Sequence, residues 1–324
     1  MMTLSKIAKE AHVSVSTASK AFSGSPEVNE ETRELVFLVA KEFGCFKKFY
    51  NAKYPKLVIA VIAPEFSSLH YTRYLSLIQQ HLSSCELCVS TTNFSADCEK
   101  DLIDYYYKHS NADGIILIDP IAELPPKMEI PVAVLRGVRS ASPPVPQYTT
   151  VYIDYRDAVK EALTYLKDRG VTSVGFLGEE RTGGKEQLFR TMMDHLSIPL
   201  NPDNMIRINA RFEEGGYEAM NALLKQGTPP RALLCAYDYM AIGAIKSLTD
   251  HGYKVPEDVA ILGMDDLPEA RFLNPPLASV TSSPEERCRL VTDAILRRIN
   301  GDAVENEIVI PAKFQLRRSF CIDP

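Results

Sequence analysis

The start of the chain has the hydrophobic period of a short amphipathic helix. Leu4, Ile7, Ala8 and Ala11 occur at positions i, i+3, i+4 and i+7, which places their side chains on one helix face. Thr3 precedes this pattern, and threonine is a preferred N-cap residue. The pattern therefore predicts a helix that begins after Thr3 and ends near Ala11.

A second short helix is predicted after a break at His12 and Val13, from about residue 15 to residue 22 with Ser14 as its N-cap. Its apolar and polar side chains point in opposite directions, namely Ala18, Ala21 and Phe22 against Ser16, Ser19 and Lys20. Two short helices joined by a tight turn are typical of a helix-turn-helix, whose second helix enters the DNA major groove. Because the unit is short, two ordinary helices of a globular core remain an alternative.

A third helix is predicted after Asn29, which precedes the acidic pair Glu30 and Glu31. Gly44 is the expected stop of this helix. Its inner stripe is predicted to consist of Leu35, Leu38, Val39 and Phe43. The three helices would form a small bundle that buries Leu4, Phe22 and Val36.

From residue 57 onward, strand-like apolar runs alternate with helical segments. Strands are expected at 57–62, 87–90, 114–118, 132–135, 151–153, 174–177, 205–208, 232–235 and 259–263, with a last strand-like segment at 313–320. Helices are expected at 71–83, 97–109, 156–168, 185–196, 215–226 and 239–251. Continuous apolar strands between helices predict parallel sheets covered on both faces. The number of strands fits two doubly wound halves, which bind ligands at the carboxyl ends of their strands.

Length and charge distribution support this division. A chain of 324 residues is long enough for two or three domains. Residues 1–56 carry nine Lys or Arg against six Glu, a charge of +3, which leaves −9 on the rest of a chain whose total is −6. A basic N-terminal segment on an otherwise acidic chain is expected where only that segment binds a polyanion.

The chain has no apolar run long enough to cross a membrane and no signal-peptide pattern at its start. We therefore expect a cytoplasmic protein without a membrane partner. The seven cysteines are odd in number, and no second pair or nearby histidine completes a metal site at Cys85 and Cys88. These cysteines are interpreted as structural.

No motif in the chain demands catalysis. The segment from Gly178 to Lys185 resembles a phosphate-binding loop, but its lysine comes one position late and Glu186 replaces the Ser or Thr that would hold magnesium. The six histidines show no metal-ligand spacing: His12, His70, His81, His109, His195 and His251. We expect no enzyme activity, no cofactor and no metal.

Several segments together resemble the lactose-repressor (LacI/GalR) family of bacterial transcription regulators. Residues 4–24 and 28–33 are similar to the DNA-binding headpiece of that family. Five segments are similar to its periplasmic-binding-protein-like effector domain: 112–116, 238–244, 255–260, 263–266 and 275–277. The resemblance covers nearly the whole chain. It implies a headpiece at residues 1–46, a linker at 47–56 and an effector-binding and dimerisation domain at 57–324.

In that domain the resemblance implies an N-lobe of about 57–155 and 285–312, and a C-lobe of about 156–284 and 313–324. It also assigns DNA contacts. Val15, Ser16 and Lys20 would read bases. Phosphate contacts or helix caps would come from Thr3, Thr17, Ser19 and Ser23. His12 replaces the glycine usual in the turn, and histidine tolerates a positive φ.

The linker departs from the family pattern. The usual Arg-Pro-Asn segment is replaced by Phe46, Lys47 and Lys48, and the linker is about three residues short. We expect Lys47, Lys48 and Lys53 to contact phosphates. A minor-groove wedge by Tyr54 or Phe49 is the alternative to a purely basic tether.

Effector contacts are implied in both lobes. Lys185, Tyr237 and Asp265 correspond to the Arg, Asn and Asp of the family's C-lobe, and lysine lacks the bidentate fork of arginine. The further candidates are Phe212 in the C-lobe and His70, Tyr71 and Arg136 in the N-lobe. Each of these could instead be a rim residue. The substitutions at Lys185 and Tyr237 put a free sugar in doubt, and a charged or differently shaped effector, or no effector, is compatible.

The mechanism that the resemblance implies is allosteric. A homodimer would bind a pseudo-palindromic double-stranded operator. A small molecule, sugar-like in the family, would bind between the two lobes, close them and thereby change the spacing of the headpieces. No leucine heptad follows the last strand-like segment, so we expect no tetramer. The rival classes are a solute-binding receptor, which would need a secretion signal, and a doubly wound enzyme, which would need a catalytic constellation.

Overall fold

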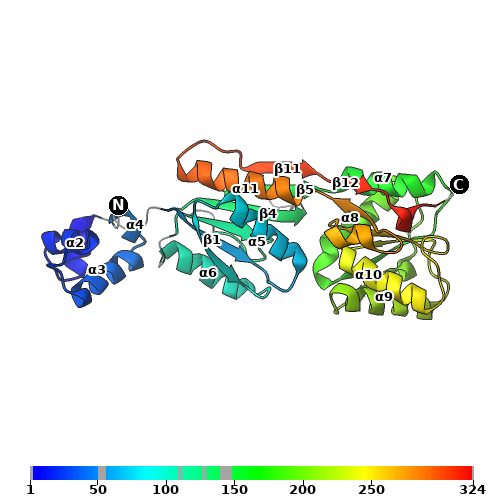
Figure 1. Ribbon diagram of the computed structural model, residues 1–324, viewed down its shortest axis with the longest axis horizontal. Coiled ribbons are helices and arrows are strands. Elements are labelled where there is room, and N and C mark those ends of the chain that lie inside the picture. The colour runs from blue at the N-terminus through cyan, green and yellow to red at the C-terminus, as the bar shows by residue number, and fades with distance from the viewer. Residues whose placement is uncertain are drawn as a thin grey trace. The chain divides into compact units, whose positions relative to one another are not determined.

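The computed structural model describes residues 3–49, 56–108, 110, 112–125, 128, 130–138 and 148–322 (Figure 1). Contacts divide the chain into two compact units. The first unit comprises Met1–Gly137, Ala141–Val151 and Pro284–Ile308, and the second comprises Val138–Ser140, Tyr152–Ser283 and Val309–Pro324. Lys53, Tyr54 and His109 lie outside the described residues, as do the side chains of Lys47 and Lys48.

The headpiece contains three helices: α1 (Leu4–Glu10), α2 (Val15–Phe22) and α3 (Glu30–Glu42). The predicted caps are confirmed, because Thr3, Ser14 and Asn29 accept hydrogen bonds from backbone N–H groups in the first turns of these helices. His12 has a φ of 53° in the turn between α1 and α2, as expected, and Gly44 has a φ of 62° after α3.

The predicted inner stripe of α3 is wrong for three of its four residues. Leu35, Leu38 and Phe43 are 43%, 54% and 49% exposed, whereas the buried residues of α3 are Val36, Val39 and Ala40. One residue along a helix is a rotation of about 100°, so Leu35 is turned away from the core that its neighbour Val36 faces. The buried partners in α1 and α2 are Ile7, Ala8, Ala18, Ala21 and Phe22, and Leu4 is half-buried against them.

A short helix, α4 (Phe46–Phe49), packs onto the headpiece through aromatic rings. The ring centroids of Phe37 and Phe46 are 4.9 Å apart, and those of Phe22 and Phe49 are 5.6 Å apart. In the free chain the Phe49 ring lies against the headpiece core, and a minor-groove wedge at Phe49 stays a prediction for the DNA-bound chain.

The first unit also contains a sheet whose strands are ordered β11-β5-β4-β3-β1-β2. The strands are β1 (Val58–Ala63), β2 (Glu86–Thr91), β3 (Gly114–Ile118), β4 (Val132–Val138), β5 (Tyr148–Asp154) and β11 (Glu307–Pro311). Its helices are α5 (Leu69–His81), α6 (Ala96–Lys108) and α11 (Pro284–Ile299). The pairs β1–β2, β1–β3 and β3–β4 are parallel. Strand β3 is buried along its whole length, as expected for a sheet covered on both faces.

The second unit contains a sheet ordered β12-β10-β9-β8-β6-β7. Its strands are β6 (Val174–Glu179), β7 (Met205–Ile208), β8 (Ala232–Cys235), β9 (Ala260–Met264), β10 (Ala278–Thr281) and β12 (Lys313–Gln315). Its helices are α7 (Arg156–Lys167), α8 (Gly183–His195), α9 (Phe212–Gln226) and α10 (Asp238–Asp250), with 3-10 turns η1 (Glu180–Thr182), η2 (Pro202–Asn204), η3 (Pro268–Phe272) and η4 (Arg318–Phe320). Two sheets of the doubly wound class are thus confirmed.

Two features at the edge of this sheet differ from the prediction. Strand β12 is antiparallel to β10, whereas the pairs from β7 to β10 are parallel. The strand-like segment 313–320 forms a strand only over Lys313–Gln315 and then turns into η4. An antiparallel edge strand on an otherwise parallel sheet is common in such folds.

Two glycines allow α9 and α10 to approach each other closely. A Cβ atom on Gly216 would lie 1.9 Å from the carbonyl oxygen of Met240, and one on Gly243 would lie 1.9 Å from the carbonyl oxygen of Glu213. Both distances are far inside van der Waals contact. Only glycine at these positions permits the observed helix pair, and this packing places the N-termini of the two helices next to each other.

Gly243→Ala should therefore destabilise the protein by about 2 kcal/mol, because overpacking of the helix contact outweighs the better helix propensity of alanine. The measurement is the free energy of unfolding in urea. Gly183→Ala is the matched control, since the nearest neighbour of its Cβ would be the Arg207 guanidinium at 4.0 Å. Equal stability of the two variants would contradict the proposed close contact.

Candidate functional sites

Helix α2 presents the outward face predicted for a recognition helix. Val15 is 47% exposed, and Ser16, Ser19 and Lys20 are exposed along the same helix. Thr17 is half-buried, and its hydroxyl lies 2.8 Å from that of Ser14. The exposed face of α2 therefore carries small and polar side chains and one cation, and it is accessible to a DNA groove.

Several DNA-contact candidates already make bonds within the headpiece. Lys20 forms an ion pair with Glu27, and this cation lowers the pKa of the Glu27 carboxyl. The Ser23 hydroxyl donates to the carbonyl oxygen of Lys20 at 3.0 Å, and the Thr3 hydroxyl accepts from the N–H of Lys6 at 3.4 Å. Thr3 and Ser23 therefore act at helix ends in the free protein, and Lys20 must exchange Glu27 for any DNA partner.

The loop between α2 and α3 is held by Arg33, a residue to which the sequence analysis assigned no role. Its guanidinium donates to the carbonyl oxygens of Ser25 and Val28 at 2.9 and 3.0 Å and pairs with Glu30 at 2.5 Å. This arginine fixes the segment that carries Glu27, the partner of Lys20. The signals in the sequence were its position just inside a helix start and its place within residues 28–33, which resemble the family's headpiece.

The four candidates of the second unit come together at the carboxyl ends of its parallel strands. Lys185 lies in the first turn of α8 after β6, and Phe212 is the first residue of α9 after β7. Tyr237 follows β8, and Asp265 follows β9. Each of these neighbouring strands is thus followed by one candidate residue, as the doubly wound pattern predicts.

Lys185 and Asp265 form a nearly buried ion pair. Their Nζ and Oδ1 atoms are 3.4 Å apart, and the side chains are only 16% and 12% exposed. Lys185 also donates to the carbonyl oxygen of Ala236 at 2.7 Å and lies 5.7 Å from the ring centroid of Tyr155. This placement orients the Asp265 carboxylate, whose remaining lone pairs suit hydroxyl donors.

Tyr237 and Phe212 form an aromatic wall beside this pair. The Tyr237 hydroxyl accepts from the backbone N–H of Phe212 at 3.1 Å. Burial raises the pKa of Tyr237 to about 12, so its O–H group stays available as a donor at neutral pH. Phe212 has a φ of 57°, and the Arg211 guanidinium lies 4.4 Å from the centre of its ring. The Tyr237 hydroxyl, a hydrogen-bond donor, therefore lies next to the apolar face of the Phe212 ring.

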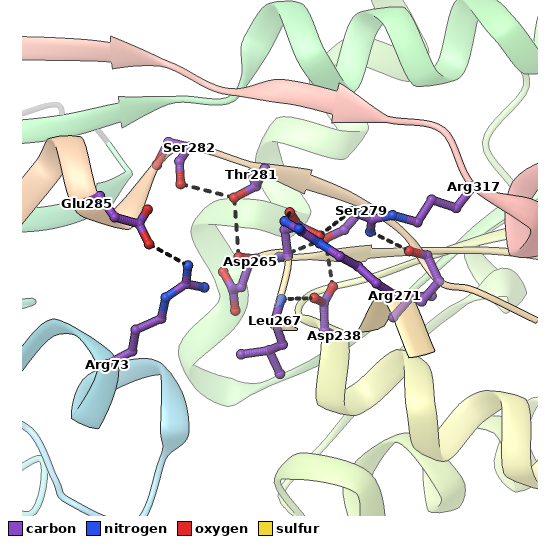
Figure 2. Close-up of polar contacts among 12 residues, drawn as sticks. Arg73, Asp238, Asp265, Leu267, Arg271, Ser279, Thr281, Ser282, Glu285 and Arg317 are labelled. Atoms are coloured by element: carbon purple, nitrogen blue, oxygen red, sulfur yellow. Dashed lines mark hydrogen bonds and ion pairs between the residues drawn. The ribbon is translucent and has the colours of Figure 1, made fainter. Parts of the chain in front are cut away.

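The turn after β9 has an unusual backbone, with φ values of 111° at Asp265 and 49° at Asp266. Figure 2 shows the side chains that hold it. The Ser279 hydroxyl accepts from the N–H of Asp266, and Asp238 accepts from the N–H of Leu267. Neither Asp238 nor Ser279 was predicted from the sequence to have a role. Asp238 does lie within one of the segments that resemble the family, and this was the available signal.

The three candidates of the first unit lie in two elements. His70 and Tyr71 lie in the first turn of α5, not in a loop, with their ring centroids 5.2 Å apart. Arg136 lies within β4, which extends three residues beyond the predicted strand end. Its carbonyl oxygen accepts from Arg287 at 3.3 Å, and Arg287 also donates to the Tyr74 hydroxyl. Tyr74 in turn packs against His70 at a ring distance of 4.7 Å.

A shallow surface depression lies at the carboxyl ends of β1, β2 and β3. Its lining includes Pro64, Phe94, Glu99 and Asp119, but not His70, Tyr71 or Arg136. Glu99 is buried there and accepts from the N–H groups of Ile121 and Ala122 at 2.9 and 3.0 Å. Tyr71 adjoins this depression without lining it, because its ring centroid lies 6.4 Å from that of Phe94.

Within the described part of the chain, no group of three or more His, Cys, Asp or Glu side chains is arranged to hold a metal ion. In the same residues, no helix has both the length and the apolar character needed to cross a membrane. Glu186, at the end of the segment that resembles a phosphate-binding loop, pairs with Arg190 at 2.8 Å and Arg207 at 2.5 Å.

Two family models match different parts of the chain. The family model of bacterial regulatory proteins, lacI family, matches residues 3–45, and that of the periplasmic binding protein-like domain matches residues 163–320. The HTH-type transcriptional regulator GalR of Streptococcus thermophilus is 28% identical, over 92% of this chain and 93% of that protein. The HTH-type transcriptional repressor PurR of Pasteurella multocida is 26% identical, over 95% of each.

A solved structure shares the fold. The complex of the transcriptional regulator CelR with cellobiose has a TM-score of 0.70 and 23% identity, over 98% of this chain and 100% of that chain. At this level of identity the comparison shows the fold alone.

Tyr237→Phe should destabilise the second unit by about 1 kcal/mol, because the N–H of Phe212 loses its hydrogen-bond acceptor. Urea unfolding followed by circular dichroism measures this loss. Tyr105→Phe is the control, since Tyr105 is 52% exposed on α6, and it should leave stability unchanged. If the two variants unfold alike, the Tyr237 hydroxyl does not hold the start of α9.

Proposed function

The chain belongs to the lacI family of bacterial regulatory proteins, and from this premise we propose that it is a repressor whose affinity for operator DNA is controlled by a small molecule bound in the second unit. Its relatives GalR and PurR are named as HTH-type transcriptional regulators and cover nearly the whole chain. The observation that carries the proposal is the combination of an exposed recognition helix with a convergent polar site. We assign no enzymatic reaction to the protein, and we place its action in the cytoplasm.

DNA reading is assigned to the exposed face of α2. The Val15 side chain offers an apolar contact to a thymine methyl group, Ser16 a hydrogen bond to a base edge, and Lys20 a cation for guanine. Thr3, Thr17, Ser19 and Ser23, with Lys47, Lys48 and Lys53, would set register on the phosphates. Breaking the Lys20–Glu27 pair on binding costs little, because both side chains are largely exposed.

The effector is proposed to be a sugar or sugar derivative. The Asp265 carboxylate can accept hydrogen bonds from hydroxyl groups, Tyr237 can donate one, and the Phe212 ring offers an apolar face. Lys185 is held by Ala236 and Asp265, so it orients Asp265 and adds positive charge. His70, Tyr71 and Arg136 are proposed as the contacts from the first unit. A ligand other than a sugar is the alternative, because Lys185 and Tyr237 replace the residues usual in the family.

The working assembly is proposed to be a homodimer. Two headpieces would then engage two operator half-sites, and symmetry of the protein would match symmetry of the DNA. The small molecule must bind one state of the protein more tightly than the other, with a coupling of about 1–3 kcal/mol.

Lys20→Ala should abolish the preference for operator over random DNA, because it removes the proposed base contact. Lys9→Ala is the matched control: it removes one positive charge from the exposed end of α1 and should keep the preference. Affinities of both variants for the two DNAs are measured by gel shift across a salt series, and nonspecific, salt-sensitive binding should stay largely intact in Lys20→Ala. Equal loss of preference in both variants would show that Lys20 reads no base.

A sugar that binds in the second unit should raise the unfolding temperature, since a ligand at about 100 times its Kd adds about 2.7 kcal/mol of stability. A thermal-shift screen of monosaccharides, disaccharides and sugar phosphates measures this effect. Asp265→Asn should abolish the shift, and Asp97→Asn, an exposed residue at the start of α6, should preserve it. A full shift in Asp265→Asn would place the ligand elsewhere.

A further inference from the structure

Asp238 is a fully buried carboxyl group beside the proposed effector site. It is the first residue of α10 and has no exposed surface. Its Oδ2 atom accepts from the backbone N–H of Leu267 at 2.7 Å, and its Oδ1 atom accepts from the Ser279 hydroxyl at 2.7 Å. Figure 2 shows this carboxyl between the turn after β9 and strand β10.

Ser279 extends the same network to the preceding residue of the turn. Its hydroxyl oxygen accepts from the backbone N–H of Asp266 at 3.0 Å. Together, Asp238 and Ser279 bind two consecutive N–H groups of a segment whose φ values at Asp265 and Asp266 are 111° and 49°. A left-handed conformation is unfavourable for a residue other than glycine, and these hydrogen bonds offset that cost.

The conformation of the turn decides where the Asp265 carboxylate points. The backbone of Asp265 is held on both sides, because its N–H donates to the carbonyl oxygen of Val280 at 3.0 Å and its carbonyl oxygen accepts from the Thr281 hydroxyl at 3.2 Å. With the backbone fixed in this way, the side chain meets Lys185 at 3.4 Å. A relaxed turn would not hold the carboxylate at this position.

Gly263, in β9, leaves the space that Asp238 occupies. A Cβ atom at Gly263 would lie 2.2 Å from Oδ1 of Asp238, which is far inside contact distance. Strand β9, the start of α10 and the turn after β9 therefore all contact the Asp238 carboxyl group.

We propose that Asp238 is a positioning residue of the effector site, which sets the conformation of the Asp265–Leu267 turn and thereby aims Asp265 at the ligand. The inference rests on the proposed role of Asp265 in effector binding. Asp238 itself touches no ligand, because it has no exposed surface.

The charges around Asp238 make its protonation state part of this role. Burial, together with the neighbouring carboxylates of Asp265 and Asp266, raises the pKa of Asp238 to about 8, although the hydrogen bonds from Ser279 and Leu267 act in the opposite direction. Asp266 is itself paired with Arg271 at 3.1 Å and Arg317 at 2.6 Å. The other titratable neighbours are Cys235 of β8 and Tyr239 of α10, and burial raises the pKa of both.

The sign of the pH effect follows from this shift. The pKa of Asp238 in the folded chain, about 8, lies above its ordinary value of 3.8, so its contribution to stability is lost as pH rises toward 8. At pH 7 the carboxyl is mostly neutral. Above pH 8 it becomes an anion that repels the Asp265 carboxylate, and the turn loosens.

Hydrogen exchange of the full-length chain, followed by mass spectrometry without any effector, tests the proposal. After correction for intrinsic exchange, protection of the Asp266 and Leu267 amides should fall about tenfold between pH 6.5 and 9 in the wild type. Asp238→Asn should keep its protection across this range, because an amide reproduces the neutral carboxyl. Asp238→Ala should lose protection at every pH, while amides of β9 stay protected.

The proposal is overturned if Asp238→Asn shows the wild-type pH profile, or if Asp238→Ala stays protected. Should Asp238→Ala fail to fold, Ser279→Ala replaces it, and loss of protection at Asp266 is then the expected result. Since no small molecule is added, the outcome does not depend on whether an effector binds. Failure of the thermal-shift screen would therefore count against the proposed function alone.

Discussion

Parallel pairing of the strands in the second unit is the constraint on which its site depends. Because β6, β7, β8 and β9 run in the same direction, the segments that follow them emerge at one edge of the sheet. Lys185 and Asp265, 80 residues apart in the chain, meet there. The close packing of α9 on α10, which requires Gly216 and Gly243, adds Phe212 and Tyr237 to the same place. The turn after β9 completes the site at the expense of local backbone strain.

The headpiece works on a different physical basis. Its core is small and aromatic, and its recognition face depends on exposure and charge. Lys20 is held by Glu27 in the free protein, and the segment that carries Glu27 is fixed by Arg33. Because both side chains are largely exposed, this ion pair is weak, and DNA can take the place of Glu27 at little cost.

Features set by local interactions were predictable from the sequence, and features set by tertiary packing were not. The caps at Thr3, Ser14 and Asn29 and the positive φ of His12 follow from neighbouring residues and were found. The rotational phase of α3 depends on which face meets α1 and α2, and the apolar residues Leu35 and Leu38 gave the wrong phase. Lys185, Phe212, Tyr237 and Asp265 were identified through a family resemblance, but their mutual contacts needed coordinates. Asp238 could not be assigned a role, because its burial depends on Gly263 and on Ser279, a residue 41 positions away.

The central claim is that the second unit and the headpiece act as one switch. Fluorescence anisotropy of labelled operator DNA with the full-length chain tests it directly, in the absence and presence of a small molecule that saturates the second unit. If the second unit and the headpiece act as one switch, the Kd for operator should change by about 5- to 150-fold on saturation. Asp265→Asn should remove this change. An unchanged Kd at full saturation of the small-molecule site would contradict the account.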